Sequence, residues 1–247
     1  MKRESFGRIG DIALACAVSV LLWECLSLAV GARTLTPPLE TAQRIFALLG
    51  QAGFQNDLIA TARAYFGALA IAMAGGLALG TIFGGWKAIG EPLEPGLHVL
   101  VATPKVAFYP VILLLFGLGD AAKIAFGVLH GLPPVAIITA NAIRELNPIY
   151  RKVALTLRLN RRHTAWRVLV PSVMPEILGG FRIGFGQVLL GVLVGEMFAS
   201  SRGVGHLLMA SIGVDDQPTI LAIVTLVFLF AGTGSAVLLA LSERRKA

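Results

Sequence analysis

The stretch NAIRELNPIYRKVALTLRLNRRHTAWRVLVPSVMP, residues 141–175, decides how this chain is organised. It holds seven Lys and Arg residues between positions 144 and 167, and it lies between two long apolar runs. Short loops rich in Lys and Arg beside apolar spans stay on the cytosolic side of a membrane. We therefore predict a cytosolic insert, residues 144–174, between two membrane-spanning helices.

The first part of this insert is predicted to be a short amphipathic helix. Asn147 can accept hydrogen bonds from the free N–H groups of the first turn, and Pro148 suits a position where the missing N–H costs nothing. Ile149, Val153 and Leu157 then recur at a spacing of four and form one apolar stripe.

A second helix is predicted to follow within the insert. Asn160 can cap its start, and the helix is expected to continue until Pro171, where a missing N–H and the proline ring oppose helical geometry. Pro175 is then expected to open the next membrane span.

The composition of the whole chain is that of a membrane protein. Of its 247 residues, 56% are hydrophobic and 14% are charged, whereas soluble domains carry about 25% charged residues. A helix needs about 20 apolar residues to cross the hydrocarbon core. We predict an all-α, polytopic protein that is a single transmembrane domain, residues 1–247. Its six expected transmembrane helices are residues 12–30, 64–84, 96–118, 124–143, 175–198 and 219–242.

The distribution of positive charge predicts the orientation of these spans. Fourteen Lys and Arg residues fall near the two termini, the loop after the second span and the insert, and four fall on the opposite side. Both termini and the insert are therefore expected in the cytosol. The same distribution explains the net charge of +7 without nucleic-acid binding. The first apolar run exceeds the 7–15 or so residues typical of a signal peptide, which favours a retained span.

The segment 36–57, on the side opposite the insert, has two interpretations. Its apolar residues alternate with polar ones in a pattern typical of a short helix at the membrane interface. A plain connector is the alternative.

Three ionisable residues within the predicted spans are candidates for the translocation pathway, because a charge in hydrocarbon is costly. Lys105 and Arg182 are expected at a similar depth on the cytosolic side, where they would either attract an anion into an inner vestibule or extend to the interface. Glu196 is expected near the other surface. It would close a gate by pairing across a dimer, bind the turn Ser200–Gly205, or hold a buried structural partner.

Glycines repeat at a spacing of four within several spans. This spacing lets helix backbones approach closely and indicates tight helix packing. The repeats are Gly76, Gly80 and Gly84; Gly127 and Gly131; Gly180 and Gly184; and Gly191 and Gly195.

Sequence motifs for chemistry on this chain are absent. There is no G-x-x-x-x-G-K-[ST] loop to hold ATP phosphates, and there is no H-E-x-x-H, C-x-x-C or G-x-S-x-G. We therefore expect no catalytic residues, no metal site and no cofactor on this chain.

The string VALTLRLNRRHTAWRVLVPSVMPEILGGFR, residues 153–182, resembles the cytoplasmic signature of ABC-transporter permeases. That signature has a Glu-Ala-Ala helix, a glycine, and a turn with two prolines. By position the corresponding residues are Lys152, Val153 and Ala154, then Arg158, then Pro171 and Pro175. Lys152 replaces an acid and Arg158 replaces the glycine. This departure has three interpretations: an unusually acidic groove on the partner, an alignment that is off by one residue here, or altered coupling.

Three further strings carry the resemblance across most of the chain. They are TPKVAFYPVILLLFGLGDAAKI (103–124), GEMFASSRGVGHLL (195–208) and LSERRK (241–246). They resemble the branch of these permeases that imports nitrate, sulfonates such as taurine, and related small solutes.

The resemblance implies a transport subunit of the bacterial inner membrane that performs no covalent chemistry itself. It implies a separate ABC ATPase that binds ATP and Mg²⁺ and docks on the first helix of the insert. It also implies a periplasmic binding protein and a second copy of this chain in a homodimer, all surrounded by membrane lipid. The solute is expected to be small and anionic. A secondary transporter or a passive channel is the alternative, although either would leave the insert without a role.

Overall fold

The computed structural model describes residues 2–31, 34–157 and 159–244, and within these ranges all regular structure is helical. The all-α prediction is thereby confirmed. In chain order the helices are α1 (Lys2–Val30), α2 (Pro38–Leu49), α3 (Ala52–Gly85), α4 (Lys87–Ala102), α5 (Tyr109–Phe116), α6 (Asp120–Arg144), α7 (Pro148–Thr156), α8 (Arg161–Thr164), α9 (Val170–Ala199), α10 (Val204–Gly213) and α11 (Gln217–Arg244).

Four helices in the described ranges are long and apolar enough to cross a membrane: α3, α6, the helix that contains α9, and α11. A fifth span results if α4 and α5 are counted together. The apolar part of α1, Leu14–Val30, is shorter than these four helices. The predicted positions of the second, fourth, fifth and sixth spans are thus confirmed to within a few turns, while the count of six stays a prediction.

The third predicted span, residues 96–118, is wrong as a single straight helix. Its helix ends at Ala102, a 3₁₀ turn covers Lys105–Phe108, and the two halves are bent by 100°. The cause is Pro104, which has no N–H group and forces Thr103 into an extended conformation with ψ 140°.

The expected helix end at Pro171 is also wrong. Helix α8 continues through a π-helical turn, Ala165–Leu169, directly into α9, and Pro175 lies inside α9. A π turn changes the local hydrogen-bond register, and such turns are one of the ways in which a helix continues next to a proline. Ser172 adds a hydrogen bond from its hydroxyl to the carbonyl of Val168, at 2.6 Å.

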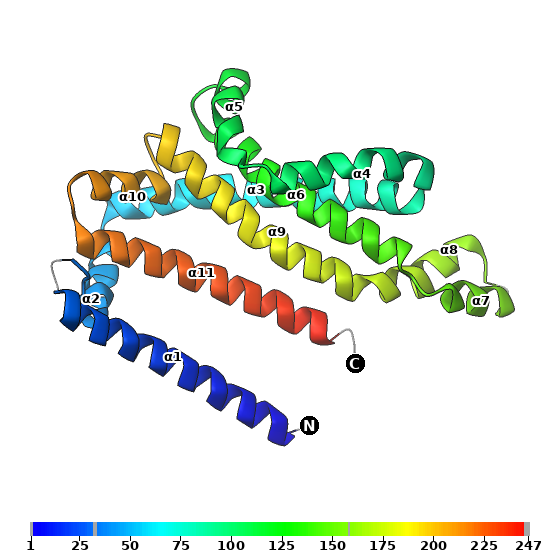
Figure 1. The fold of residues 1–247 in the computed structure, drawn as a ribbon, viewed down its shortest axis with the longest axis horizontal. Coiled ribbons are helices and arrows are strands. Elements are labelled where there is room, and N and C mark those ends of the chain that lie inside the picture. Colours follow the sequence, from blue (N-terminus) through cyan, green and yellow to red (C-terminus); the bar gives the residue numbers. More distant parts are fainter. Residues whose placement is uncertain (1, 32–33, 158, 245–247) are drawn as a thin grey trace.

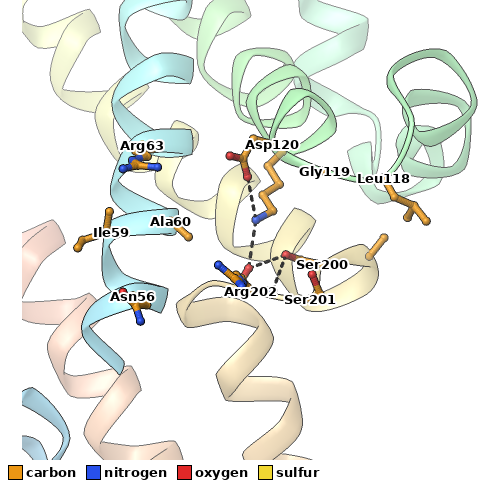
Figure 2. A pocket seen from close by; sticks show the side chains of 12 residues that line it. Asn56, Ile59, Ala60, Arg63, Leu118, Gly119, Asp120, Ser200, Ser201 and Arg202 are labelled. Carbon is orange, nitrogen blue, oxygen red and sulfur yellow. Dashed lines mark hydrogen bonds and ion pairs between the residues drawn. The ribbon is translucent and has the colours of Figure 1, made fainter. Parts of the chain in front are cut away.

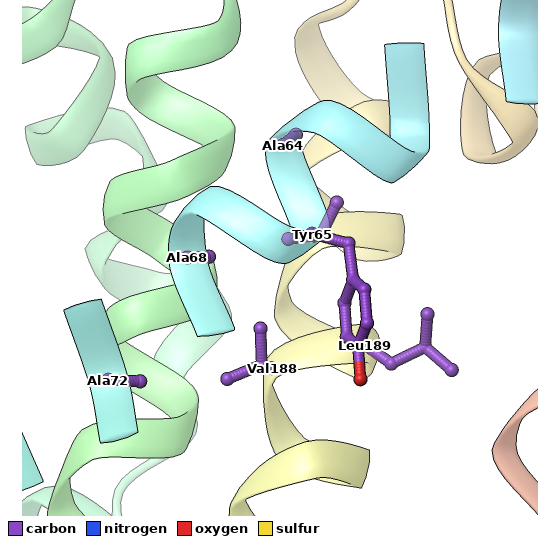
Figure 3. Packing of buried hydrophobic residues seen from close by; sticks show 7 residues of the cluster. Ala64, Tyr65, Ala68, Ala72, Val188 and Leu189 are labelled. Carbon is purple, nitrogen blue, oxygen red and sulfur yellow. The ribbon is translucent and has the colours of Figure 1, made fainter. Parts of the chain in front are cut away.

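The helices α3, α6 and α9 form the packed centre of the molecule. Figure 3 shows small side chains of α3, Ala68 and Ala72, near Val188 of α9. The close helix packing that the glycine spacing predicts occurs between α3 and α6. A Cβ added at Gly80 of α3 would lie 2.5 Å from the backbone carbonyl oxygen of Ala136 of α6. Gly191 of α9 approaches the backbone of α6 in the same way.

The arrangement of the chain separates two ends of the bundle. In Figure 1 the start of α1, the end of α11, the α3–α4 turn and the helices α7 and α8 lie toward one end. Helices α2 and α10 lie at the other end. The two groups match the two sides that the charge distribution predicts, and the cytosolic orientation of the first group stays a prediction.

The segment 36–57 contains a short helix, α2, as the first of its two interpretations predicts, and this helix packs against α11. Arg44 of α2 forms an ion pair with Asp216 at 3.2 Å and donates a hydrogen bond to the hydroxyl of Thr219 at 2.8 Å. The rest of the segment belongs to α3, which begins twelve residues before the predicted second span. Its location at a membrane interface stays a prediction.

Candidate functional site

The insert between α6 and α9 has the two helix caps that the sequence predicts. The side-chain oxygen of Asn147 accepts a hydrogen bond from the N–H of Ile149 at 3.0 Å. The side-chain oxygen of Asn160 accepts one from the N–H of His163 at 2.8 Å. These caps fix where α7 and α8 begin, so the insert is a helical element with defined limits.

The predicted ATPase-coupling residues are distributed over this insert and the start of α9. Lys152 is exposed on α7. Val153 and Ala154 also belong to α7, but their side chains fall outside the described part of the structure, and Arg158 lies outside the described residues altogether. Pro171 and Pro175 lie in α9. The contact of these residues with an ATPase stays a prediction.

The insert exposes large apolar side chains. Ile149, Leu157 and Trp166 are 56%, 63% and 68% exposed. The insert also exposes the basic residues Lys152, Arg162 and Arg167. It lies at the end of the bundle where α1 begins and α11 ends (Figure 1). Such an apolar and basic surface is suited to bind another protein.

The base of the insert is held by an ion pair that sequence reasoning missed. Arg144, at the end of α6, pairs with the mostly buried carboxylate of Glu94 on α4. Arg144 also donates a hydrogen bond to the backbone oxygen of Phe83 in α3, at 3.0 Å. Three helices are therefore joined at the point where the insert begins.

At the opposite end of the bundle, Glu196 of α9 is completely buried. One carboxylate oxygen accepts hydrogen bonds from the Thr61 hydroxyl at 2.8 Å and from the N–H of Gly205 at 3.0 Å. The other lies 3.7 Å from the Lys123 ammonium nitrogen. The Thr61 hydroxyl in turn accepts a hydrogen bond from the N–H of Val204 at 2.8 Å. We call these residues the Glu196 cluster.

The Glu196 cluster fixes the loop between α9 and α10. Gly203 has φ +120°, and a Cβ there would collide with the carboxylate of Glu196, so only glycine fits. The N–H of Gly203 donates to the carboxylate of Asp57 at 2.8 Å. Two of the three interpretations of Glu196 are therefore met, since it accepts a hydrogen bond from Gly205 of the turn and has the buried partners Thr61 and Lys123. A gating role of Glu196 stays a prediction. Pairing of Glu196 across a dimer would require this cluster to open.

The other two pathway candidates, Lys105 and Arg182, form their polar contacts with other groups than Glu196. Lys105 is partly exposed at the bend between α4 and α5, where its ammonium nitrogen lies 3.3 Å from the carbonyl oxygen of Val101. Arg182, exposed on α9, donates a hydrogen bond to the hydroxyl of Ser235 on α11 at 2.6 Å. A role of Lys105 and Arg182 in an anion vestibule stays a prediction, with extension to the interface as the alternative.

Sequence reasoning missed Thr61 and Lys123 of the cluster, and Asp57 beside it. The charge of Lys123 by itself suggests a loop residue. Its depth in the membrane could have indicated the contact. Lys123 directly precedes the fourth predicted span, and Glu196 is near the end of the fifth, so the two residues are expected near the same membrane surface. No comparable signal marks Thr61, because a threonine in a helix usually bonds to its own helix.

A polar cavity of about 640 Å³ lies beside the Glu196 cluster. Figure 2 shows its walls, which come from the start of α3, the start of α6 and the loop after α9. The charged side chains that line it are Arg63, Asp120, Lys123 and Arg202.

The fold and these two regions define a class: a helical membrane protein with several apolar spans and a helical insert at one end. The chain belongs to the family of binding-protein-dependent transport system inner membrane components, whose profile matches residues 72–247.

Curated relatives are transport permease proteins. The putative aliphatic sulfonates transport permease protein of Bacillus subtilis is 31% identical over 84% of this chain and 75% of that protein. The taurine transport system permease protein of Escherichia coli is 26% identical over 72% of this chain and 66% of that protein. The nitrate import permease protein of Synechococcus elongatus is 26% identical over 76% and 71%.

A solved structure shares the fold. The crystal structure of an amino acid ABC transporter with histidines superposes with a TM-score of 0.57 at 18% identity, over 83% of this chain and 96% of that chain.

Proposed function

We propose that this chain is the permease subunit of an ATP-driven ABC importer for a small anionic solute of the nitrate, sulfonate or taurine kind. A second copy would complete the translocation path, a periplasmic binding protein would deliver the solute, and a separate ATPase would bind ATP and Mg²⁺. The family match over residues 72–247 and the names of the relatives support this proposal. The observation that carries it is the capped helical insert with its exposed apolar side chains.

In this proposal the ATPase moves the insert, and α9 transmits the movement. Residues Arg162–Ala199 form one continuous helix of 38 residues. At 1.5 Å per residue it is about 57 Å long, nearly twice the hydrocarbon core of about 30 Å. The same helix carries Trp166 at the insert and Glu196 at the far end, so a displacement at one end reaches the other without crossing a flexible loop.

The energy that the ATPase must supply can be bounded. Shifting a two-state population from 1:99 to 99:1 requires a difference of about 5.5 kcal/mol between the states. A docking surface that carries such a difference must be firm, which fits the caps at Asn147 and Asn160 and the Arg144–Glu94 pair at the base of the insert.

Co-purification tests the proposal. The tagged chain, expressed with the ATPase of its own operon or genome neighbourhood, should retain that ATPase through purification. Deletion of residues 151–162, and separately Trp166→Glu, should abolish the association while membrane insertion persists. Trp86→Glu is the matched control, because Trp86 is 61% exposed on the α3–α4 turn outside the insert. Retention of the ATPase by both insert variants would refute the docking role. Solute flux by the chain alone would instead favour a channel or secondary transporter.

A further inference from the structure

We infer that the polar cavity at the end of α9 is a binding site for a small oxyanion, a sulfonate or nitrate, on the permease itself. This inference rests on the proposed function, and it adds a solute site at the end of the bundle opposite the insert. The cavity lies between α3, α6 and the α9–α10 loop (Figure 2).

The charge of the cavity walls is positive. Arg63, Lys123 and Arg202 line it against a single carboxylate, that of Asp120. Lys123 is already engaged, since its ammonium nitrogen lies 3.3 Å from Asp120 and 3.7 Å from Glu196. Among the described residues, neither Arg63 nor Arg202 has an ion-pair partner. Two guanidinium groups from different elements therefore remain to attract an anion, and guanidinium matches the geometry of oxyanions.

The wall that carries Arg202 is fixed before any ligand arrives. The carbonyl oxygen of Arg202 accepts hydrogen bonds from Lys123 at 3.1 Å and from the hydroxyl of Ser200 at 2.5 Å. Its neighbour Gly203 is held by Asp57. Ligand binding therefore needs to order only the arginine side chains, which lowers its entropic cost.

The volume and the remaining lining fit a small organic anion. A cavity of about 640 Å³ lies within the range of ligand sites. Ile59, Ala60 and Leu118 provide apolar walls for a short carbon chain, and Asn56 and Ser201 provide neutral hydrogen-bonding groups. Because both unpaired arginines are exposed to water, binding is expected to be weak and to decrease with salt.

The test measures which charge the cavity admits. In a full-length chain with Cys16→Ser and Cys25→Ser, a single thiol is introduced as Ser201→Cys. It is reacted with an anionic sulfonatoethyl and a cationic trimethylammonioethyl methanethiosulfonate, and each rate is divided by that for a free thiol in solution. We expect the anionic reagent to be favoured about tenfold, because a charged cleft concentrates counter-ions by that order. Arg63→Gln with Arg202→Gln should bring the ratio near one.

Competition and a matched position complete the test. Methanesulfonate and nitrate should protect the Ser201→Cys thiol more than gluconate does at equal ionic strength. Leu39→Cys, on exposed α2 outside the cavity, should show neither the preference nor the protection. Equal normalised rates at Ser201→Cys, or a preference that survives loss of both arginines, would overturn the inference.

Two further comparisons distinguish a solute site from a lipid site, and the solute site from the docking role of the insert. Protection by methanesulfonate should be the same in maltoside detergent and in phosphatidylcholine nanodiscs; protection lost in the lipid would assign the cavity to a phospholipid headgroup and overturn the inference. The labelling uses the chain without its ATPase. ATPase co-purification without anion preference would therefore leave the proposed function standing and remove only this site.

Discussion

At the scale of single residues, the hydroxyl of Thr61 connects three helices. One hydroxyl donates to the buried carboxylate of Glu196 and accepts from the N–H of Val204, so it joins α3, α9 and α10. Its loss would leave two buried groups short of a partner, and each such group costs about 1–3 kcal/mol.

We therefore predict that Thr61→Val, which keeps the shape and removes the hydroxyl, lowers the free energy of unfolding by about 1–3 kcal/mol. Thr61→Ser, which keeps the hydroxyl, should lose less. Thermal unfolding of the purified protein in detergent measures both. Equal losses in the two variants would show that the methyl group, rather than the hydrogen bonds, matters at this position.

Gly191 and Gly186 form a second pair of residues for comparison on α9. A Cβ at Gly191 would lie 2.8 Å from the backbone oxygen of Phe126, whereas a Cβ at Gly186 meets nothing within 4 Å. Alanine favours a helix over glycine by about 1 kcal/mol, but forcing a group into a packed interface costs about 1–3 kcal/mol. Gly191→Ala should lower the melting temperature, and Gly186→Ala should leave it unchanged or raise it. A stable Gly191→Ala variant would argue against the close α6–α9 approach.

At the scale of elements, α2 is fastened to the start of α11 by Arg44, Asp216 and Thr219. Partial burial raises the pKa of Asp216, but hydrogen bonds from Thr219 and the charge of Arg44 outweigh it, and the pKa lies below its ordinary value. A carboxylate with a lowered folded-state pKa stabilises the protein above its unfolded pKa of about 3.9. That contribution is lost as the pH falls through the folded-state pKa.

Asp216→Asn is accordingly predicted to lower the melting temperature at pH 7, with the difference from the unsubstituted protein closing below about pH 4. Asp215→Asn is the matched control, because Asp215 accepts a hydrogen bond from Gln217 and has no arginine partner among the described residues. Thermal unfolding over this pH range measures both variants. A difference that stays constant with pH would show that the Asp216 charge is not involved.

Much of the architecture was predictable from the sequence because a membrane limits what a chain can do. Long apolar runs predict α3, α6, α9 and α11, and Asn147 and Asn160 predict the starts of the insert helices. The prolines were less predictable. Pro104 breaks a helix and Pro171 does not, since the outcome depends on whether the neighbouring turn can widen, as Ala165–Leu169 does.

A residue of the candidate sites could be predicted only where its type is unusual for its place in the sequence. Glu196 is conspicuous as an acid within an apolar span, and its hydrogen bond to the following turn could be predicted from that position. Its partner Thr61 lies 135 residues earlier in the sequence, and its partner Lys123 also comes from another helix. Whether these side chains face Glu196 depends on how each helix is rotated about its axis, which hydrophobic periodicity does not fix. The same is true of the Arg144–Glu94 pair.

At the scale of the whole molecule, the helix Arg162–Ala199 links the insert to the Glu196 cluster. Its first turns, after Arg161, belong to the insert, and its last turns hold Glu196 and the wall of the polar cavity. In the proposed function, this helix receives force at one end of the bundle and changes access at the other. The central claim is that an ATPase applies that force at the insert.

Site-specific photo-crosslinking tests this claim most directly. A benzoylphenylalanine placed at the exposed position Lys152 of α7, in native membranes that contain the ATPase, should crosslink to the ATPase. The same group at Ile212 of α10, which is 48% exposed at the opposite end, should not. Crosslinking of the ATPase from Ile212, or from neither position while the ATPase co-purifies, would contradict the account.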